Sequence, residues 1–308
     1  MTAQPTDFDT ENPSNEQSSG LPRVSVIIPV YNDGDPLEKC LEALEHQTYP
    51  DSKFQVNVVD NASDENIEAV VDSFECARVL FEAQPGSYAA RNRGVRETDG
   101  DILAFTDADC VPVDSWIEEG VGHLTGGTGC DLLGGRIEFT FRTPGQPSPP
   151  EYFDATHYLD QAKYVHEEKF AATANAFTWR RLFEEVGLFD TSRRSGGDLE
   201  WGQRVHRNGG ILCYSKSARV QHPARQYEGL RRKILRIVEG KVQERKRQEY
   251  PLRELLVDLV WDIGHHVKFP ITMAIREQPS WSEVARSLVA FPYQGTSAAL
   301  KRIEVWLR

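Results

Sequence analysis

Residues 24–32 read Val-Ser-Val-Ile-Ile-Pro-Val-Tyr-Asn. The first seven form an apolar, β-rich run with few polar breaks, which is typical of a strand buried on both faces of a parallel sheet. An Asp-Pro pair then opens residues 35–47, where Leu37, Leu41 and Leu44 recur at the spacing of one helix face. The stretch therefore predicts the first β-α unit of an α/β fold.

The same alternation continues along the chain. Strands are expected at 54–60, 77–81 and 101–106, and helices from about 63 and over 87–96. This order predicts an open parallel sheet with right-handed crossovers. Beyond it the expected elements are strands at 131–141, 211–214 and 218–221, and helices at 151–168, 179–186, 197–208 and from 226 onward. Neither G-x-G-x-x-G nor a P-loop follows the first strand, which argues against a dinucleotide-binding or P-loop fold.

Charge divides the chain of 308 residues, whose net charge is −12. Residues 1–22 carry four acids and no base, and are expected to be a disordered tail. Residues 219–247 carry ten bases against three acids, or +7. An acidic body of this kind is a poor partner for nucleic acid, whose recognition needs clustered cations, and a better one for a metal cation.

Five cysteines are widely spaced and form no C-x-x-C pair. They argue against a disulfide framework or a zinc site, and free thiols in a reducing cytosol are expected. The polar N-terminus has no signal-peptide pattern, and no run approaches the roughly 18 apolar residues of a membrane-spanning helix. The expected location is cytoplasmic.

Asp107-Ala108-Asp109 stands directly after the strand expected at 101–106. In open α/β sheets, ligands bind beyond the carboxyl ends of the strands. Two carboxylates at this position can hold a hard divalent cation, Mg²⁺ or Mn²⁺, which prefers oxygen ligands and bridges to phosphates. The alternative is an ordinary surface turn.

Five short segments, in this order and spacing, resemble a family 2 glycosyltransferase with the GT-A fold. They are residues 26–32, 58–63, 86–94, 105–110 and 196–200. The resemblance covers residues 23–223 as the catalytic domain and leaves 224–308 as a C-terminal amphipathic helical region. It implies transfer of a sugar, as by a hexosyltransferase, from a nucleotide diphosphate donor linked to UDP, GDP or dTDP. It also implies inversion at the anomeric carbon.

The resemblance assigns nucleotide contacts to several residues. Pro29, Val30 and Tyr31 resemble the loop that lies against base and ribose, although Tyr31 as a core tyrosine is the alternative. Asp60 stands where the family binds the nucleobase, which for a carboxylate favours uracil, thymine or guanine; a helix cap or turn is the other interpretation. Arg91 is expected to neutralise a phosphate or hold the base.

The implied metal site uses the same turn. Asp109 resembles the principal ligand of the D-x-D pair, and Asp107, with Ala108 between them, contacts ribose or metal. The cation would stabilise the departing diphosphate. His222 follows a short expected strand and is a further metal candidate, with a structural histidine as the alternative.

Asp198 aligns with the family's presumed general base, which takes the proton from the acceptor hydroxyl. Gly197 stands where the family often has Glu, which puts the first acid of that motif in doubt. A loop with a helix cap is the alternative for residues 196–198. Residues 175–181 resemble a region that lines the acceptor and donor-sugar pocket, where Trp179 either stacks on a sugar or simply packs.

The basic segment at 225–247 carries an apolar stripe at helical spacing: Leu230, Ile234, Ile237, Val238 and Val242. Such a helix either lies on an anionic membrane surface or packs on the catalytic domain. Residues 252–263 and 284–291 are also amphipathic, and self-association into a homo-oligomer is a further expectation for this region.

The favoured hypothesis is a metal-dependent inverting glycosyltransferase whose acceptor is lipid-linked or a polysaccharide, working at the cytosolic side of a membrane. A non-catalytic GT-A module that binds carbohydrate or membrane is the first alternative. A sugar nucleotidyltransferase is the second, and it is disfavoured because the first-strand loop lacks the Gly-rich, basic pattern that a triphosphate needs.

Overall fold

One mixed sheet of eight strands organises residues 20–247, which the computed structural model describes. The strand order is β3-β2-β1-β4-β7-β6-β8-β5. The strands are β1 (Val24–Val30), β2 (Phe54–Asp60), β3 (Ala77–Phe81), β4 (Ile102–Thr106), β5 (Val111–Pro112), β6 (Leu132–Thr140), β7 (Asn175–Trp179) and β8 (Leu212–Pro223).

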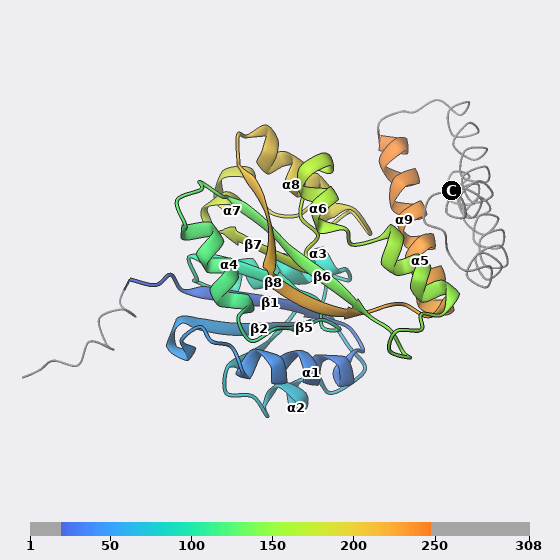
Figure 1. Cartoon of the computed structure of the whole chain (residues 1–308), viewed down its shortest axis with the longest axis horizontal. Coiled ribbons are helices and arrows are strands. Elements are labelled where there is room, and N and C mark those ends of the chain that lie inside the picture. Colours follow the sequence, from blue (N-terminus) through green and yellow to red (C-terminus); the bar gives the residue numbers. More distant parts are fainter. Residues whose placement is uncertain (1–19, 248–308) are drawn as a thin grey trace, which may run out of the picture.

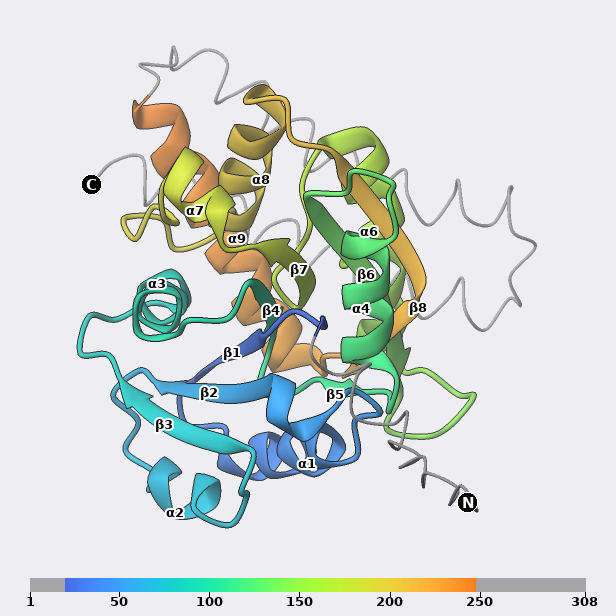
Figure 2. The same cartoon turned by 90° about the vertical axis from the view of Figure 1, so that its left-hand side faces the viewer.

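Helices cover both faces of this sheet (Figures 1 and 2). They are α1 (Gly34–Glu45), α2 (Ile67–Val71), α3 (Ser87–Glu97), α4 (Trp116–Thr125), α5 (Pro149–His157), α6 (Gln161–Lys163), α7 (Arg181–Val186), α8 (Gly197–Arg207) and α9 (Tyr227–Arg247), with a 3-10 turn η1 (Asp51–Lys53) and a π turn η2 (Tyr164–Glu168). None of the helices within 20–247 has the length and apolar character needed to cross a membrane.

The parallel half of the sheet agrees with the sequence. β1 lies between β2 and β4 and pairs parallel to both, and β3 pairs parallel to β2. Because alternate side chains of β1 point to opposite faces, Val26 and Ile28 enter one core and Ile27 enters the other. Each of these side chains is fully buried, and each burial stabilises the fold by about 1.5–3 kcal/mol.

Close packing of α3 on the sheet depends on a glycine. A Cβ at Gly94 would lie 2.5 Å from Cγ2 of Ile27, so only a glycine lets the helix approach β1 this closely. The same helix carries Tyr88 and Arg91 toward the carboxyl ends of β1 and β4, so this close approach also sets the positions of these two side chains.

The mostly parallel sheet that the sequence predicts is confirmed, and its strand directions are mixed beyond β4. β7 pairs antiparallel to both β4 and β6. The chain enters β7 at the end of the sheet where β4 leaves it. There the Thr106 hydroxyl, at the end of β4, donates a hydrogen bond to the carbonyl of Ala174, just before β7. A reversal of this kind depends on contacts between segments about 70 residues apart, which periodicity along the chain does not report.

Two other expected elements differ. The helix expected at 151–168 is broken after His157, because Leu159 adopts a left-handed backbone with φ of 61°, and only short turns follow. The two short strands expected at 211–214 and 218–221 are one strand, β8, that pairs with β6 through a register shift at Gly135/Arg136.

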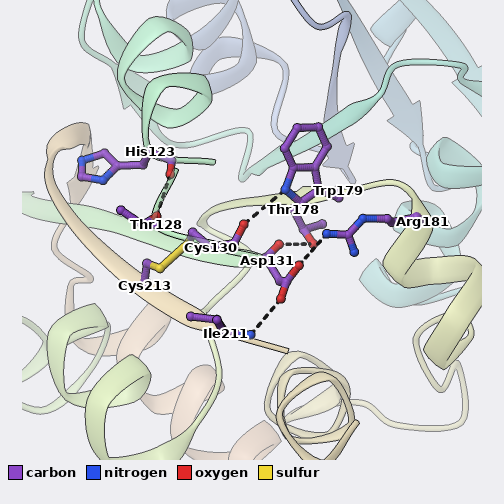
Figure 3. Close-up of a disulfide and its surroundings, with 9 residues drawn as sticks. All are labelled: His123, Thr128, Cys130, Asp131, Thr178, Trp179, Arg181, Ile211 and Cys213. Carbon is purple, nitrogen blue, oxygen red and sulfur yellow. Dashed lines mark hydrogen bonds and ion pairs between the residues drawn. A yellow bond between two sulfur atoms is a disulfide. The ribbon is translucent and has the colours of Figure 1, made fainter. Parts of the chain in front are cut away.

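A disulfide joins Cys130 and Cys213 (Figure 3). The expectation of free thiols is therefore wrong for these two residues. They are 83 positions apart, but parallel pairing of β6 with β8 brings their Cα atoms to 5.9 Å. Cys40, Cys76 and Cys110 are free thiols.

Helix α9 lies beside α5 (Figure 1). Its apolar stripe is buried in a small cluster with Phe153 of α5, made of Leu230, Ile234, Val238 and Val242. The face expected to meet a membrane is thus packed inside the protein, and the packed-helix alternative holds for 227–247. Of the tail expected at 1–22, residues 1–19 lie outside the described residues, whereas Leu21 packs against the core and the Pro22 carbonyl accepts a hydrogen bond from the Tyr49 hydroxyl. The amphipathic segments expected at 252–263 and 284–291 also lie outside the described residues.

Candidate active site

A cavity of about 470 Å³ opens at the carboxyl ends of β1 and β4. One side is formed by Pro29, Val30 and Tyr31 after β1 and by Asp107 and Asp109 after β4. The start of α8, with Asp198, lines it too, and α9 supplies a further wall. Its position matches the general rule that ligands of open α/β sheets bind beyond the strand ends.

The D-x-D turn is held by α3. The guanidinium group of Arg91 forms an ion pair with Oδ1 of Asp107, and the Arg91 side chain is only 5% exposed. Both residues line the cavity, so the pair presents a fixed charge arrangement to a ligand. Ala108 between the two acids is buried in the main core and anchors the turn rather than lining the cavity.

His222 reaches the same turn from the end of β8. Its side chain is fully buried, and its Nε2 lies 3.7 Å from Oδ2 of Asp109. Its Nδ1 lies 2.8 Å from the Pro223 carbonyl oxygen, which can only accept. Nδ1 therefore donates to this carbonyl, while Nε2 faces both Asp109 and the guanidinium group of Arg225, which lies 3.2 Å away.

This donor set fits a divalent cation. The ligand atoms of Asp109, Cys110 and His222 all lie within 4.8 Å of one another. Burial, with the charges of Asp109 and Asp107, raises the pKa of the Cys110 thiol well above its ordinary value. Without a cation the thiol is thus protonated, and the donors best suited to Mn²⁺ or Mg²⁺ are the carboxylate oxygen and the imidazole nitrogen.

A buried ion cluster connects this corner to α9. Asp154 of α5 is completely buried and accepts hydrogen bonds from the backbone and guanidinium N–H groups of Arg225 and from Nζ of Lys233. Nζ of Lys233 also lies 4.1 Å from the centroid of the Tyr158 ring. Arg225 in turn contacts Nε2 of His222 at 3.2 Å. Sequence reasoning missed this cluster, because its members are 71 and 79 positions apart.

The pKa values in this cluster move in opposite directions. Burial lowers the pKa of Lys233 to about 8, and the neighbouring charge of Arg225 contributes to the decrease. Burial alone would raise the pKa of Asp154, but Lys233 and Arg225 outweigh it and lower the pKa. The Asp154 carboxylate is therefore ionised. Both cations pair with it, and Lys233, the more buried of the two, is the one whose pKa is lowered by its burial.

Asp198 sits in the first turn of α8, on the side of the cavity lined by Tyr88. Its Oδ1 accepts hydrogen bonds from the Tyr88 hydroxyl at 3.1 Å and from the Leu199 backbone N–H at 3.0 Å. Carboxylates are stabilised at helix N-termini, where backbone N–H groups are unpaired. The carboxylate of Asp198 thus lies at the wall of the cavity, at the start of a helix.

Gly197 has a steric explanation. A Cβ at this position would lie 2.7 Å from Cε2 of Tyr88, so the Tyr88 ring occupies the space that a side chain at 197 would need. The departure from the family's Glu is thus matched by the aromatic residue of α3. Asp198, one position later, keeps its place.

The structure bears on the alternatives that the sequence left open for Asp60 and Tyr31. One oxygen of Asp60 accepts a hydrogen bond from the Ser63 backbone N–H, as the turn interpretation requires, and its neighbour Asn61 is the residue that lines the cavity. Tyr31 is 58% exposed and lines the cavity, so it is not a core tyrosine.

The hypothesis that residues 175–181 line the pocket is wrong. They belong largely to β7, which is hydrogen-bonded on both sides in the middle of the sheet. Asn175 is fully buried and donates to the carbonyls of Arg136 and Ala218. The Trp179 indole donates to the Cys130 carbonyl, so this tryptophan packs (Figure 3).

Comparison with known proteins identifies relatives of this chain by sequence and by fold. Glycosyltransferase AglE of Haloferax volcanii is 38% identical over 249 residues, which cover 79% of this chain and 81% of that protein. The fold resembles that of mannosyltransferase PcManGT from Pyrobaculum calidifontis, solved in complex with GDP-Man and Mn²⁺, with a TM-score of 0.64 at 19% identity over 93% of this chain and 88% of that one.

GalNAc-T7, solved with UDP, GalNAc and Mn²⁺, matches with a TM-score of 0.53 at 19% identity, over 67% of this chain and 44% of that one. These structural likenesses confirm the GT-A fold expected from the sequence. Residues 25–187, more than half of the chain, match the family described as glycosyl transferase family 2. The chain therefore belongs to glycosyltransferase family 2.

Proposed function

We propose that this chain is a metal-dependent, inverting glycosyltransferase that moves a hexosyl group from a nucleotide diphosphate sugar to an acceptor hydroxyl. The observation that carries the proposal is that one cavity is lined by Asp109, which has Nε2 of His222 3.7 Å behind it, and by Asp198. A cation site and a candidate base around one cavity are the two parts that direct displacement at a sugar carbon requires.

The residues divide the work by position. Asp109 and His222 would hold Mn²⁺ or Mg²⁺, with Asp107 beside them in its pair with Arg91. When bound, such a cation neutralises the diphosphate leaving group. Asp198 would take the proton from the acceptor hydroxyl as that oxygen attacks the anomeric carbon from the side opposite the departing diphosphate.

The donor is proposed to carry UDP, GDP or dTDP. Tyr31, exposed beside the cavity, is placed to lie against the nucleoside together with Pro29 and Val30, and Asp60 and Arg91 remain candidates for base and phosphate. The complexes of PcManGT with GDP-Man and of GalNAc-T7 with UDP support a nucleotide donor and a divalent metal.

The acceptor is proposed to be lipid-linked or a polysaccharide, used in the assembly of cell-surface or glycoprotein glycans. We place the enzyme in the cytoplasm, peripheral to an anionic membrane, with self-association as a further proposal. The support is the +7 charge of residues 219–247. Because the apolar stripe of α9 is buried, attraction of these cations to anionic headgroups would carry the contact.

A transfer assay tests this function. The full chain is incubated with UDP-, GDP- and dTDP-sugars, with Mn²⁺ or Mg²⁺, and with glycan or lipid-phosphate acceptors; nucleoside diphosphate release and the product anomer are then read by NMR. Release of diphosphate with an inverted anomer supports the proposal. Retention at the anomeric carbon refutes the inverting step, and pyrophosphate release would instead identify a nucleotidyltransferase. Metal-dependent donor binding without turnover would identify a non-catalytic module.

A further inference from the structure

Residues 190–196, here called the base loop, lead directly into Asp198. Helix α9 lies against this loop, and both line the same cavity. Two ion pairs join them: Nη1 of Arg193 lies 2.7 Å from Oε2 of Glu244, and Nη1 of Arg194 lies 3.3 Å from Oε2 of Glu239. The base loop is thus attached to a helix that follows it in the chain by more than 30 residues.

The two ion pairs do not weigh equally. The Arg194 side chain is 66% exposed, and exposed pairs contribute little because water and salt screen them. The Arg193 side chain is only 18% exposed, and its Nε also lies 3.2 Å from Oδ2 of Asp190. Arg193 is therefore held between its own loop and α9, and it is the stronger of the two links.

Gly240 is the third contact. A Cβ at this position would lie 3.2 Å from Cβ of Ser195 and 3.3 Å from its carbonyl oxygen, which is tighter than ordinary packing. Glycine inside a helix lowers helix stability, so its presence in α9 needs a reason. Close approach of the base loop supplies that reason, since any side chain at 240 would push Ser195 away.

The position of the base loop also affects the position of Asp198, because only Gly197 separates them in the chain. The loop ends at Gly196, whose φ is +75°, and Gly197 fits against the Tyr88 ring before Asp198 is reached. Asp198 is therefore fixed on one side by the Tyr88 hydroxyl and on the other by a loop clamped to α9. A shift of about an ångström at a reacting group is enough to slow a reaction strongly.

We propose that Glu239, Gly240 and Glu244 of α9 form a latch that holds the base loop and so sets the position of Asp198 for the transfer step. They are positioning residues that act through the loop. The inference rests on the proposed function only in naming Asp198 as the base. It assigns to α9 a role in the reaction itself, beyond its packing on α5.

The glycines of α9 supply a matched pair for the test. Gly240→Ala adds a methyl group against Ser195, whereas Gly229→Ala adds one where the nearest atom, Cβ of Arg225, is at an ordinary 3.5 Å. Both changes replace a glycine of α9 with alanine, the better helix former. We expect Gly240→Ala to lower kcat at least tenfold without lowering Tm and with the donor KM within twofold, while Gly229→Ala leaves kcat unchanged. Equal kcat values for the two variants would overturn the latch.

Charge reversal tests the ion pair. Glu244→Arg and Arg193→Glu should each lower kcat and speed amide hydrogen exchange in residues 190–197 by at least tenfold. The double variant should recover both in part, because it restores the pair with α9 but not the pair of Arg193 with Asp190. Glu228→Gln, on an exposed part of the same helix, is the control. Exchange that stays at the wild-type level in the single variants, or a double variant no better than they are, refutes the latch. Because exchange does not depend on turnover, it reports on the loop contact even if the proposed transfer activity is absent; altered exchange together with unaltered kcat would refute the role of the loop in positioning Asp198.

Discussion

The hydroxyl group of Tyr88 on α3 donates a hydrogen bond to Oδ1 of Asp198 on α8, across 110 positions of sequence. Burial raises the pKa of Tyr88, and the Asp198 charge adds to the effect, so the phenol stays protonated and serves as a donor. One carboxylate oxygen is thereby fixed, and Oδ2 makes no hydrogen bond to the residues at 20–247 whose contacts are described. This leaves Oδ2 for the acceptor hydroxyl that we propose.

Asp198→Asn should abolish proton transfer without disturbing the donor site. An amide of the same shape can still accept from Tyr88 but cannot take a proton. We expect transfer to fall about 100- to 10,000-fold, the usual contribution of a general base. Donor affinity in calorimetry should stay within twofold. Glu185→Gln on exposed α7 is the control, and an Asp198→Asn enzyme that keeps more than a tenth of wild-type transfer would dismiss Asp198 as the base.

Gly197→Ala should destabilise the protein, because its Cβ would lie 2.7 Å from a carbon of the Tyr88 ring. Overpacking of this kind typically costs about 1–3 kcal/mol. Chemical denaturation measures it. Gly122→Ala in α4 has open space around its Cβ and should instead leave stability unchanged or raise it by up to about 1 kcal/mol. Equal unfolding free energies for the two variants would mean that Tyr88 does not fill the space beside residue 197.

Asp154→Asn should lower the free energy of unfolding by about 3–5 kcal/mol, since it leaves Lys233 and Arg225 buried beside a neutral amide. Lys233→Met should cost much less, because Asp154 keeps its pair with Arg225 and the methionine fills the same space. Urea denaturation at pH 7 compares the two. A larger loss of unfolding free energy in Lys233→Met than in Asp154→Asn would show that Asp154 is not the residue on which the cluster depends most.

The same cluster predicts a dependence on pH. Lys233 has a pKa of about 8 in the folded protein against 10.5 when unperturbed, so between these values the unfolded chain binds a proton that the folded chain lacks. Stability of the wild type relative to Lys233→Met should therefore rise with pH in that window, by at most about 1.4 kcal/mol for each pH unit. Paired denaturation series from pH 7 to 10 measure the difference. A difference that stays flat or falls across the window would contradict the lowered pKa.

Opening the Cys130–Cys213 disulfide should affect stability and leave the site alone. A disulfide typically contributes about 2–4 kcal/mol, and long loops such as this one lie at the upper end of the range. Neither cysteine lines the cavity. The Cys130→Ser/Cys213→Ser protein should thus unfold at a lower temperature, with kcat and donor KM unchanged at 25 °C. Changed kinetics in the folded variant would show that the β6–β8 edge communicates with the cavity.

The sequence predicted what local pattern determines. The strand at 77–81 agrees with β3 in both bounds, and Asp107 and Asp109 stand at the end of β4 as their position after an apolar strand required. Contacts between distant segments decided the rest. The antiparallel direction of β7, the Cys130–Cys213 bridge and the fit of Tyr88 against Gly197 all depend on register or packing that no single segment encodes.

The role of the basic helix α9 could not be predicted from its sequence either. Its charge and apolar stripe were visible in the sequence, but they are equally compatible with a membrane and with a protein surface. Only the buried Asp154–Lys233 pair and the base-loop contacts show that α9 forms a wall of the cavity. The acid that receives Lys233 lies 79 positions earlier, beyond the reach of any helical spacing.

Calorimetric titration of nucleotide sugars tests the central claim most directly. UDP-, GDP- and dTDP-sugars are titrated into the full chain with Mn²⁺, with Mg²⁺ and with chelator, and then into Asp109→Asn, with Asp72→Asn at the exposed end of α2 as the control. We predict that at least one donor binds only when metal is present, that Asp109→Asn weakens this binding at least about 100-fold, and that Asp72→Asn does not. Failure of every nucleotide diphosphate to bind with either metal would contradict the assignment of this cavity to a nucleotide sugar.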